Sequence, residues 1–163
     1  MIYTAKYDSP VGGISIAESD GAIISLRIDG QRLCWGIEDA AEADTPALAK
    51  ARSWLDRYFA GERMTPDDLE LAPNGSEFRK LVWELLLEIP YGETTTYGEL
   101  AKKAAARMGV AKMSAQAVGG AVGHNPISII IPCHRVIGTD GSMTGYDGGI
   151  AIKEKLLRLE GVK

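Results

Sequence analysis

Cysteine and histidine are scarce in this sequence, whose 163 residues include two of each. Two cysteines do not make the disulfide framework of a small secreted domain. A structural zinc site generally needs three or four cysteine or histidine ligands at close spacing. We therefore expect no metal, no cofactor and a reduced, cytoplasmic setting.

Long hydrophobic runs are also lacking. The strongly apolar stretch at residues 127–131 is far too short to cross a bilayer. The opening residues, MIYTAKYDSP, do not lead from a basic region into an apolar stretch, so we expect no signal peptide. With 45% apolar and 25% charged residues, the composition is typical of a soluble globular protein without a membrane partner.

Positive charge is in short supply, because 18 lysines and arginines face 22 aspartates and glutamates. The net charge of −4 argues mildly against a nucleic-acid partner. Its distribution is uneven, with a net of −6 over residues 1–74 and +2 over residues 75–163. If the protein binds DNA, we expect the second half to do so.

The first half has the pattern of a small sheet followed by a helix. Segments rich in β-branched residues at positions 2–7, 13–17 and 23–28 predict short strands, and the turn clusters between them favour an antiparallel meander. Thr45 is a candidate N-cap for a helix that begins at Pro46. Residues 61–75 have the composition of a connector.

The second half is predicted to be mainly helical. Candidate N-caps precede three apolar segments with helical periodicity, at Ser76, Thr96 and Ser114. Pro90 stops the first of these helices, and the second spans residues 97–108. The last two, separated by a turn, suggest a helix-turn-helix, a motif that is common by chance. We expect two domains, residues 1–75 and 76–163.

The sharpest chemical feature is Cys133, which is followed by His134 and Arg135. These residues end an apolar segment, bounded by prolines, that we expect to be buried and extended. A nucleophilic cysteine acts as its thiolate, which a base and a positive neighbour favour. However, neighbours in an extended segment point to opposite faces, so His134 would need a turn or a bridging water to reach the sulfur. A buried, inert cysteine is the alternative.

Residues 132–136, PCHRV, resemble the active-site motif of the O6-alkylguanine-DNA alkyltransferases, or methylated-DNA–protein-cysteine methyltransferases. Four further motifs extend the resemblance over roughly residues 76–161. They are a recognition helix at 117–121, a hinge at 125–126, a substrate-pocket loop at 145–149 and a closing helix at 156–161. The resemblance implies an α/β N-terminal domain, with an antiparallel sheet plus a helix, and a mainly α winged helix-turn-helix domain whose wing is residues 137–146.

The resemblance also implies the roles of the catalytic residues. Cys133 would be the nucleophile and the permanent acceptor of a methyl or alkyl group taken from O6-alkylguanine in DNA. His134 would act as its base through a water molecule, and Glu160 would orient and charge the imidazole. Asn125 would hold the turn between the recognition helix and the active-site segment. Transfer would be irreversible, with one turnover per molecule.

Substrate contacts follow from the same resemblance. Tyr97 would contact the flipped guanine and the rotating phosphate, and Tyr146 and the backbone N–H of Asp147 would approach the guanine oxygen. The carbonyls of Cys133 and Val136 would accept hydrogen bonds from its amino group. Base flipping is needed because the target oxygen is unreachable inside a stacked duplex. The expected partner is double-stranded DNA, with O4-alkylthymine as a second candidate lesion, and a monomer is expected.

The recognition helix would enter the minor groove, with DNA contacts predicted for Gln116, Ala117, Gly119, Gly120 and Arg135. Many family members carry arginine where Gln116 stands. Glutamine lacks the charge and the planar fork of arginine, so we expect weaker DNA binding or a narrower range of lesions.

Two features of the residues themselves support these roles. Gly119 and Gly120 should each cost a helix about 1 kcal/mol relative to alanine, which close approach to DNA or to another helix would explain. Glu160 lies beside Leu156 and Leu157 at a helix C-terminus, where its charge opposes the helix dipole. Residues that break local rules often have a function.

Two other classes of protein remain to be compared. Alkyltransferase-like proteins only flag lesions and lack the acceptor cysteine, so the presence of Cys133 disfavours them. A cysteine hydrolase generally places its cysteine and histidine far apart in sequence, unlike Cys133 and His134. The other cysteine, Cys34, has no motif around it and is interpreted as structural or incidental.

Overall fold

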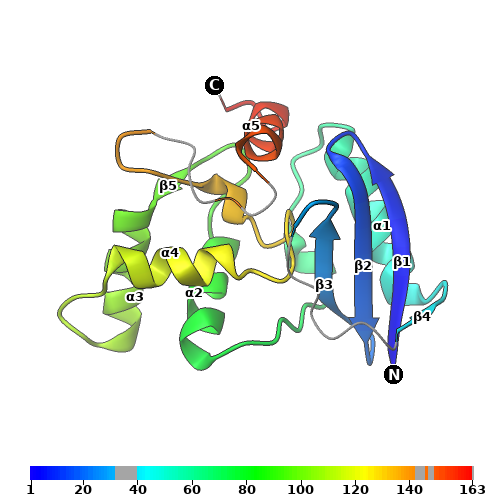
Figure 1. Cartoon of the computed structure of the whole chain (residues 1–163), viewed down its shortest axis with the longest axis horizontal. Coiled ribbons are helices and arrows are strands. Elements are labelled where there is room, and N and C mark those ends of the chain that lie inside the picture. The colour runs from blue at the N-terminus through cyan, green and yellow to red at the C-terminus, as the bar shows by residue number, and fades with distance from the viewer. Residues whose placement is uncertain (32–39, 142–145, 147–148, 163) are drawn as a thin grey trace.

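The computed structural model describes residues 1–31, 40–141, 146 and 149–162. A sheet with one helix packed on it forms the N-terminal half, and further helices form the C-terminal half beside it (Figure 1). This arrangement confirms the predicted fold class, an antiparallel sheet with a helix followed by a mainly helical region. The C-terminal helix α5 lies between the two halves at the top of the view (Figure 1).

The N-terminal sheet is the predicted antiparallel meander with one short addition. The strands lie in the order β3-β2-β1-β4, and β4 pairs in parallel with β1. The helix α1 packs against this sheet, and its first turn is capped by the Thr45 hydroxyl, which accepts a hydrogen bond from the Leu48 N–H at 3.2 Å. The bounds are β1 Ile2–Ser9, β2 Gly12–Ser19, β3 Ala22–Ile28, β4 Ala41–Glu42 and α1 Pro46–Phe59.

The C-terminal half contains the three predicted helices with their predicted caps. Ser76, Thr96 and Ser114 each accept hydrogen bonds from backbone N–H groups in the first turn that follows them. The capping pattern thus identified each helix start correctly, because capping is a local interaction. The bounds are η1 Pro66–Asp68, α2 Glu77–Leu87, β5 Thr95–Thr96, α3 Tyr97–Met108, α4 Ala115–Gly123, η2 Cys133–Arg135, β6 Val136–Ile137 and α5 Ile150–Leu159.

The helix-turn-helix consists of α3, a turn and α4. Gly109 ends α3 in the left-handed conformation, with φ of 70°, which glycine adopts without steric cost. Directly after η2, β6 pairs in parallel with β5. Residues 142–145 of the predicted wing lie outside the described residues. No helix in the described part of the chain is long and apolar enough to cross a bilayer.

The prediction that residues 127–131 are extended is wrong, although they are buried. The segment turns tightly, with the Ile131 N–H donating to the Ile127 carbonyl at 3.1 Å. Ile129 has a φ of +70°, a conformation that is rare for a β-branched residue. Such a strained loop persists only when its surroundings hold it in place.

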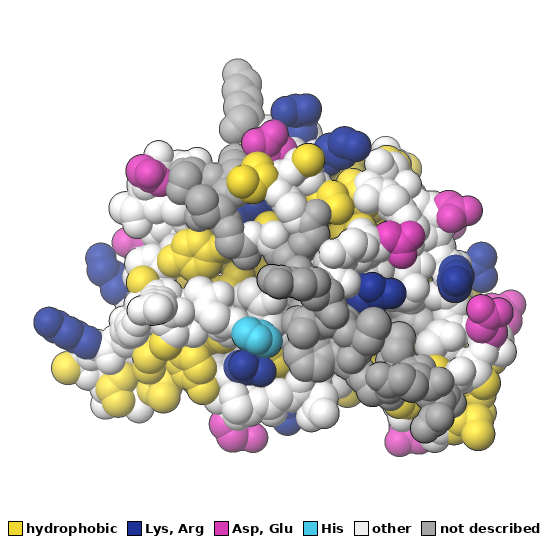
Figure 2. Space-filling view, in the orientation of Figure 1, with side chains coloured by type: hydrophobic (Ala, Val, Ile, Leu, Met, Phe, Trp, Pro, Cys, Tyr) yellow, Lys and Arg dark blue, Asp and Glu magenta, His cyan; other side chains and the backbone are white. Residues whose placement is uncertain are grey.

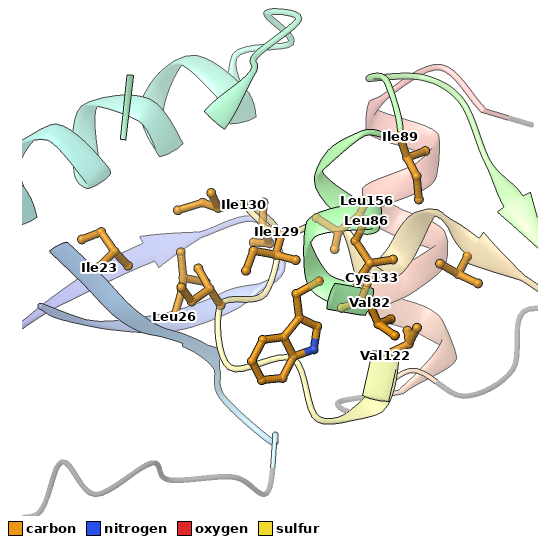
Figure 3. Close-up of a cluster of buried hydrophobic side chains, with 14 of the residues drawn as sticks. Ile23, Leu26, Val82, Leu86, Ile89, Val122, Ile129, Ile130, Cys133 and Leu156 are labelled. Carbon is orange, nitrogen blue, oxygen red and sulfur yellow. The ribbon is translucent and has the colours of Figure 1, made fainter. Parts of the chain in front are cut away.

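Both halves of the protein hold this loop. The Leu26 N–H of β3 donates to the Pro126 carbonyl at 2.9 Å, and the Leu26 carbonyl accepts from the Ser128 N–H at 3.0 Å. The side chains of Ile129 and Ile130 lie between the sheet and helix α2 (Figure 3). The segment that delivers Cys133 is therefore part of the packing between the two halves.

Candidate active site

Cys133 begins η2, a single turn of 3-10 helix that follows the buried loop. The side chain is 7% exposed and lies beside Val82 and Val122, in a buried hydrophobic cluster to which both halves of the protein contribute (Figure 3). Because Cys133, His134 and Arg135 share one tight turn, they do not alternate between opposite faces as they would in a strand. The turn thus removes the geometric objection to a functional link between Cys133 and His134.

The side chain of Asn125 joins the two ends of the buried loop. Its amide nitrogen donates to the Ile131 carbonyl at 2.8 Å, and its amide oxygen accepts from the Ile127 N–H at 3.0 Å. Asn125 is itself buried, at the junction between the end of α4 and the loop. Its position is therefore suited to holding the turn that precedes the cysteine.

Glu160 is the centre of a buried hydrogen-bond network. Its Oε2 atom lies 2.6 Å from the Nε2 atom of His134 and accepts a second hydrogen bond, also of 2.6 Å, from the Tyr58 hydroxyl. Its Oε1 atom accepts from the Nε atom of Arg135 at 2.8 Å and from the Gly92 N–H at 3.2 Å. Both carboxylate oxygens are therefore fully engaged.

The network fixes the charge on both of its central members. Burial alone would raise the pKa of Glu160, but the hydrogen bonds and charges of His134 and Arg135 outweigh it and lower the pKa to about 2. The carboxylate is thus ionised and can only accept hydrogen bonds. Burial lowers the pKa of His134, against the opposing effect of Glu160, so the imidazole is neutral at pH 7.

These charge states select one tautomer of His134. Since Glu160 only accepts, the Nε2 atom that faces it must carry the imidazole proton. The Nδ1 atom then has a free lone pair, and it is buried without a hydrogen-bond partner among the described residues. A neutral imidazole with an unprotonated, unpartnered nitrogen is suited to accept a proton.

Three further groups surround the cysteine. The Lys153 ammonium donates a hydrogen bond to the Val136 carbonyl and lies 6.0 Å from the centre of the Tyr97 ring. Burial, and after it the charge of Cys133, raise the pKa of Tyr97. Burial lowers the pKa of Lys153, while the charge of Cys133 opposes that shift. Tyr97 and Val136, both predicted to contact substrate, thus lie close to Cys133.

Arg135 does not lie where a DNA-binding residue is expected. Its side chain is buried, its Nε and Nη2 atoms donate to Glu160, and its Nη1 atom donates to the Ile89 carbonyl at 2.7 Å. The structure therefore contradicts the prediction that Arg135 contacts DNA. The tight turn points the guanidinium inward, where its charge balances that of Glu160.

The predicted recognition helix α4 exposes three of the residues predicted to contact DNA. Gln116, Ala117 and Gly120 are exposed, and Gly119 lies over the ring of Tyr97. A Cβ atom on Gly120 would meet nothing within 4 Å among the described residues, and one on Gly119 would make ordinary contacts of 3.7 Å or more. Packing within the protein therefore requires neither glycine.

Hydrophobic side chains gather over α3 and α4 on the face shown in Figure 2, with lysine and arginine side chains near its edge. Gly120 itself is exposed and has no side chain, so the backbone of α4 is open to close approach at this position. A backbone that can be approached this closely is what glycine provides at contacts with nucleic acids and other ligands.

Comparison with known families accounts for nearly the whole chain. Residues 2–73 match the model described as 6-O-methylguanine DNA methyltransferase, ribonuclease-like domain. Residues 77–162 match 6-O-methylguanine DNA methyltransferase, DNA binding domain. The chain belongs to the 6-O-methylguanine DNA methyltransferase family.

Individual members of the 6-O-methylguanine DNA methyltransferase family are similar over most of their length. A methylated-DNA–protein-cysteine methyltransferase of Methanosarcina acetivorans is 44% identical over 160 residues, covering 98% of this chain and 99% of the relative. The Mycobacterium tuberculosis protein of the same name is 44% identical over 165 residues, covering 98% and 93%. The crystal structure of Mycobacterium tuberculosis OGT in complex with DNA has a TM-score of 0.85, with 97% and 92% coverage.

Two residues of this site were missed by the sequence predictions. Lys153 shares a helical stripe with Leu156, Leu157 and Glu160, so a lysine on an apolar face was a signal that could have been used. Tyr58 gave no such signal, because a tyrosine on the apolar face of α1 is indistinguishable from an ordinary core residue. Its role depends on Glu160, which is 102 residues away.

The predicted substrate-pocket loop is described only in part. Tyr146 is half-buried and packs against the hydrophobic core, and its carbonyl accepts from the Gly149 N–H at 3.1 Å. Asp147 and Cys34 lie outside the described residues. In the part of the chain that is described, no group of three or more His, Cys, Asp or Glu residues is placed to hold a metal ion.

Proposed function

We propose that this chain repairs alkylated DNA directly, by moving the alkyl group from the O6 atom of a guanine onto the sulfur of Cys133. One observation carries the proposal. Cys133 shares a tight turn with a neutral histidine whose Nδ1 atom is free and whose Nε2 proton is held by an ionised glutamate. The similar proteins of Methanosarcina acetivorans and Mycobacterium tuberculosis are named methylated-DNA–protein-cysteine methyltransferases, which supports the same activity.

In the proposed reaction, His134 removes the thiol proton and Glu160 stabilises the resulting imidazolium. The Nδ1 atom of His134 accepts that proton through a water molecule. The thiolate then attacks the alkyl carbon, so that an S–C bond forms while the C–O6 bond breaks. The electron pair of the broken bond goes to O6, and the released guanine takes up a proton. The product is a thioether, so each molecule acts once.

For the substrate contacts, we propose that Tyr97, Tyr146 and the backbone N–H of Asp147 contact the flipped guanine. The Val136 carbonyl already accepts from Lys153, and its second lone pair remains for the guanine amino group. Tyr97 lies beneath Gly119, so the proposed guanine site and the recognition helix are adjacent.

For DNA binding, we propose that α4 enters the minor groove with Gln116, Ala117, Gly119 and Gly120 facing the duplex. The exposed backbone at Gly120, where an added Cβ atom would meet nothing within 4 Å among the described residues, supports this placement. DNA binding by the similar Mycobacterium tuberculosis protein, whose crystal structure contains DNA, supports the partner. We further propose domains of residues 1–75 and 76–163, action as a monomer and a cytoplasmic location, with O4-alkylthymine as a second candidate lesion.

Incubation with an O6-methylguanine duplex, followed by intact-protein mass measurement, tests the proposal. We expect the mass of one methyl group per molecule, no turnover, and the modification mapped to the Cys133 peptide. Cys133→Ala should lose transfer but keep DNA binding, and the matched control Cys34→Ala should keep both. Binding without modification would instead favour a protein that only flags lesions, and repeated turnover of an ester or amide would favour a hydrolase.

A further inference from the structure

The network around Glu160 extends into the N-terminal half of the protein. Tyr58, on α1, donates its hydroxyl to the Oε2 atom of Glu160 at 2.6 Å. Tyr58 and His134 are both completely buried, and both contact the same carboxylate oxygen. A residue from the sheet-and-helix half therefore contacts the group that holds the proposed catalytic base.

The position of the Tyr58 hydroxyl is fixed by its aromatic neighbours. Its ring stacks on Trp54, with centroids 5.4 Å apart and planes at 7°. The edges of Phe59 and Tyr91 meet it at 84° and 78°. Because the ring is packed on several sides, the hydroxyl has a fixed position from which it can hold the Glu160 carboxylate.

We propose that Tyr58 is a positioning residue of the acceptor site, whose hydroxyl holds Glu160 in the geometry in which Oε2 accepts the Nε2 proton of His134. This inference rests on the proposed function. It also gives the N-terminal half a defined part in the reaction, because Tyr58 lies on α1, whereas α4 and the turn that holds Cys133 belong to the C-terminal half.

The hydroxyl should also limit how strongly Glu160 attracts a proton onto His134. Burial and the charge of Glu160 raise the pKa of Tyr58, so its hydroxyl stays protonated and always donates. This donation disperses the negative charge on Oε2, which would otherwise stabilise the imidazolium more strongly. Tyr58 thereby favours the neutral imidazole, whose Nδ1 atom is free to take the thiol proton.

Several other elements that pack around His134 and Glu160 contribute charged or titratable groups. Arg135 on η2 pairs with Glu160, and Lys153 on α5 affects the pKa of His134 by its charge. Tyr91, after α2, lies beneath the guanidinium groups of Arg63 and Arg135. These groups remain in a Tyr58→Phe variant, so that substitution isolates the hydroxyl.

The test compares Tyr58→Phe with Tyr7→Phe as a matched control. Tyr7 also lies in the N-terminal half and donates to a carboxylate, that of Asp56 at 2.6 Å, but this pair is exposed and outside the network. Single-turnover methyl transfer is measured against pH. We expect the acid limb of the Tyr58→Phe profile to move to higher pH by about 0.5 to 1 unit, and the Tyr7→Phe profile to match the wild type.

A second measurement needs neither DNA nor transfer. Nitrogen NMR of the imidazoles reports the tautomer and titration of His134, with His124 as an internal reference because the chain has only two histidines. The titration of His134 should move upward in Tyr58→Phe. If Tyr58→Phe does not fold, fluorinated tyrosine at position 58 keeps the shape, and its stronger donation should move the titration downward.

The two proposals fail in different ways. If the wild type does not transfer a methyl group, the proposed function fails, whereas the NMR titration still tests the link from Tyr58 to His134. If the wild type transfers normally and neither the rate profile nor the His134 titration moves when the hydroxyl is removed or fluorinated, the positioning role of Tyr58 is overturned.

Discussion

Replacing Gly120 with alanine should make the protein more stable and its DNA binding weaker. Gly120 lies in the interior of α4, it is exposed, and an added Cβ atom would meet nothing within 4 Å in the described part of the chain. No packing penalty therefore opposes the helix propensity of alanine. Glycine costs a helix interior about 0.5–1 kcal/mol relative to alanine.

The expected sizes of the two effects follow from that position. For a chain of this size, 1 kcal/mol corresponds to roughly 2–4 °C in Tm, so we expect Gly120→Ala to raise the Tm by about 1–4 °C. If α4 lies against the groove, the same methyl group would be forced into a close contact. Overpacking of this kind costs about 1–3 kcal/mol, which is roughly a 5- to 150-fold loss of affinity.

Thermal unfolding and fluorescence anisotropy with an O6-methylguanine duplex measure both effects in one preparation. Gly98→Ala is the matched control, since Gly98 is also helical and an added Cβ atom there would lie 3.9 Å from its nearest neighbours. It should raise the Tm while changing affinity by no more than about twofold. A more stable Gly120→Ala variant with unchanged affinity would refute the placement of α4 in the groove.

Three further predictions concern charge. Gln116→Arg should tighten binding to methylated duplex in a titration, because arginine adds a charge and a planar donor group; an unchanged dissociation constant would count against this. The folded-state pKa values of His134 and Glu160 are both lowered, so proton uptake favours unfolding. Urea unfolding should therefore show stability falling as pH drops below about 6.5, the ordinary value for histidine, and again between about 4.5 and 2 for Glu160. In Glu160→Gln the second fall should be absent, and stability at pH 7 should be lower by about 3–5 kcal/mol because Arg135 loses its partner. Finally, the affinity for DNA should depend weakly on salt. We expect a plot of log K against log salt concentration to have a slope shallower than about −4, because the protein makes fewer phosphate contacts than the six to ten that give a steep dependence. A steeper slope in anisotropy titrations would contradict this.

The elements that the sequence predicted well are those determined by neighbouring residues. Helix starts at Thr45, Ser76, Thr96 and Ser114 were correct, because each cap bonds to N–H groups two or three residues away. The meander was correct because its turn clusters and β-branched segments alternate along the chain. The short strands β4, β5 and β6 were missed, since two residues give no pattern to detect.

The errors lie where distant residues decide the structure. The segment at 127–131 has the composition of a strand, but Asn125 and Leu26 fold it into a tight loop. Arginine is usually exposed, yet Arg135 is buried because it donates a hydrogen bond to Glu160, which is 25 residues away in the sequence. The roles of the site residues, including Asp147 outside the described residues, stay predictions until they are tested.

The burial of Arg135 changes how DNA recognition must be understood. Arg135 and Lys153 are 7% and 1% exposed, so two of the basic side chains in the C-terminal half serve the interior and not the phosphate backbone. The modest positive charge of that half is therefore smaller still at its surface. Phosphate neutralisation dominates most DNA binding, but a protein of net charge −4 has few cations to spare for it, so we expect recognition here to depend on it less. We therefore expect close contact between α4 and the groove to supply much of the affinity, so that one methyl group at Gly120 should matter more than one charge at the edge of this surface.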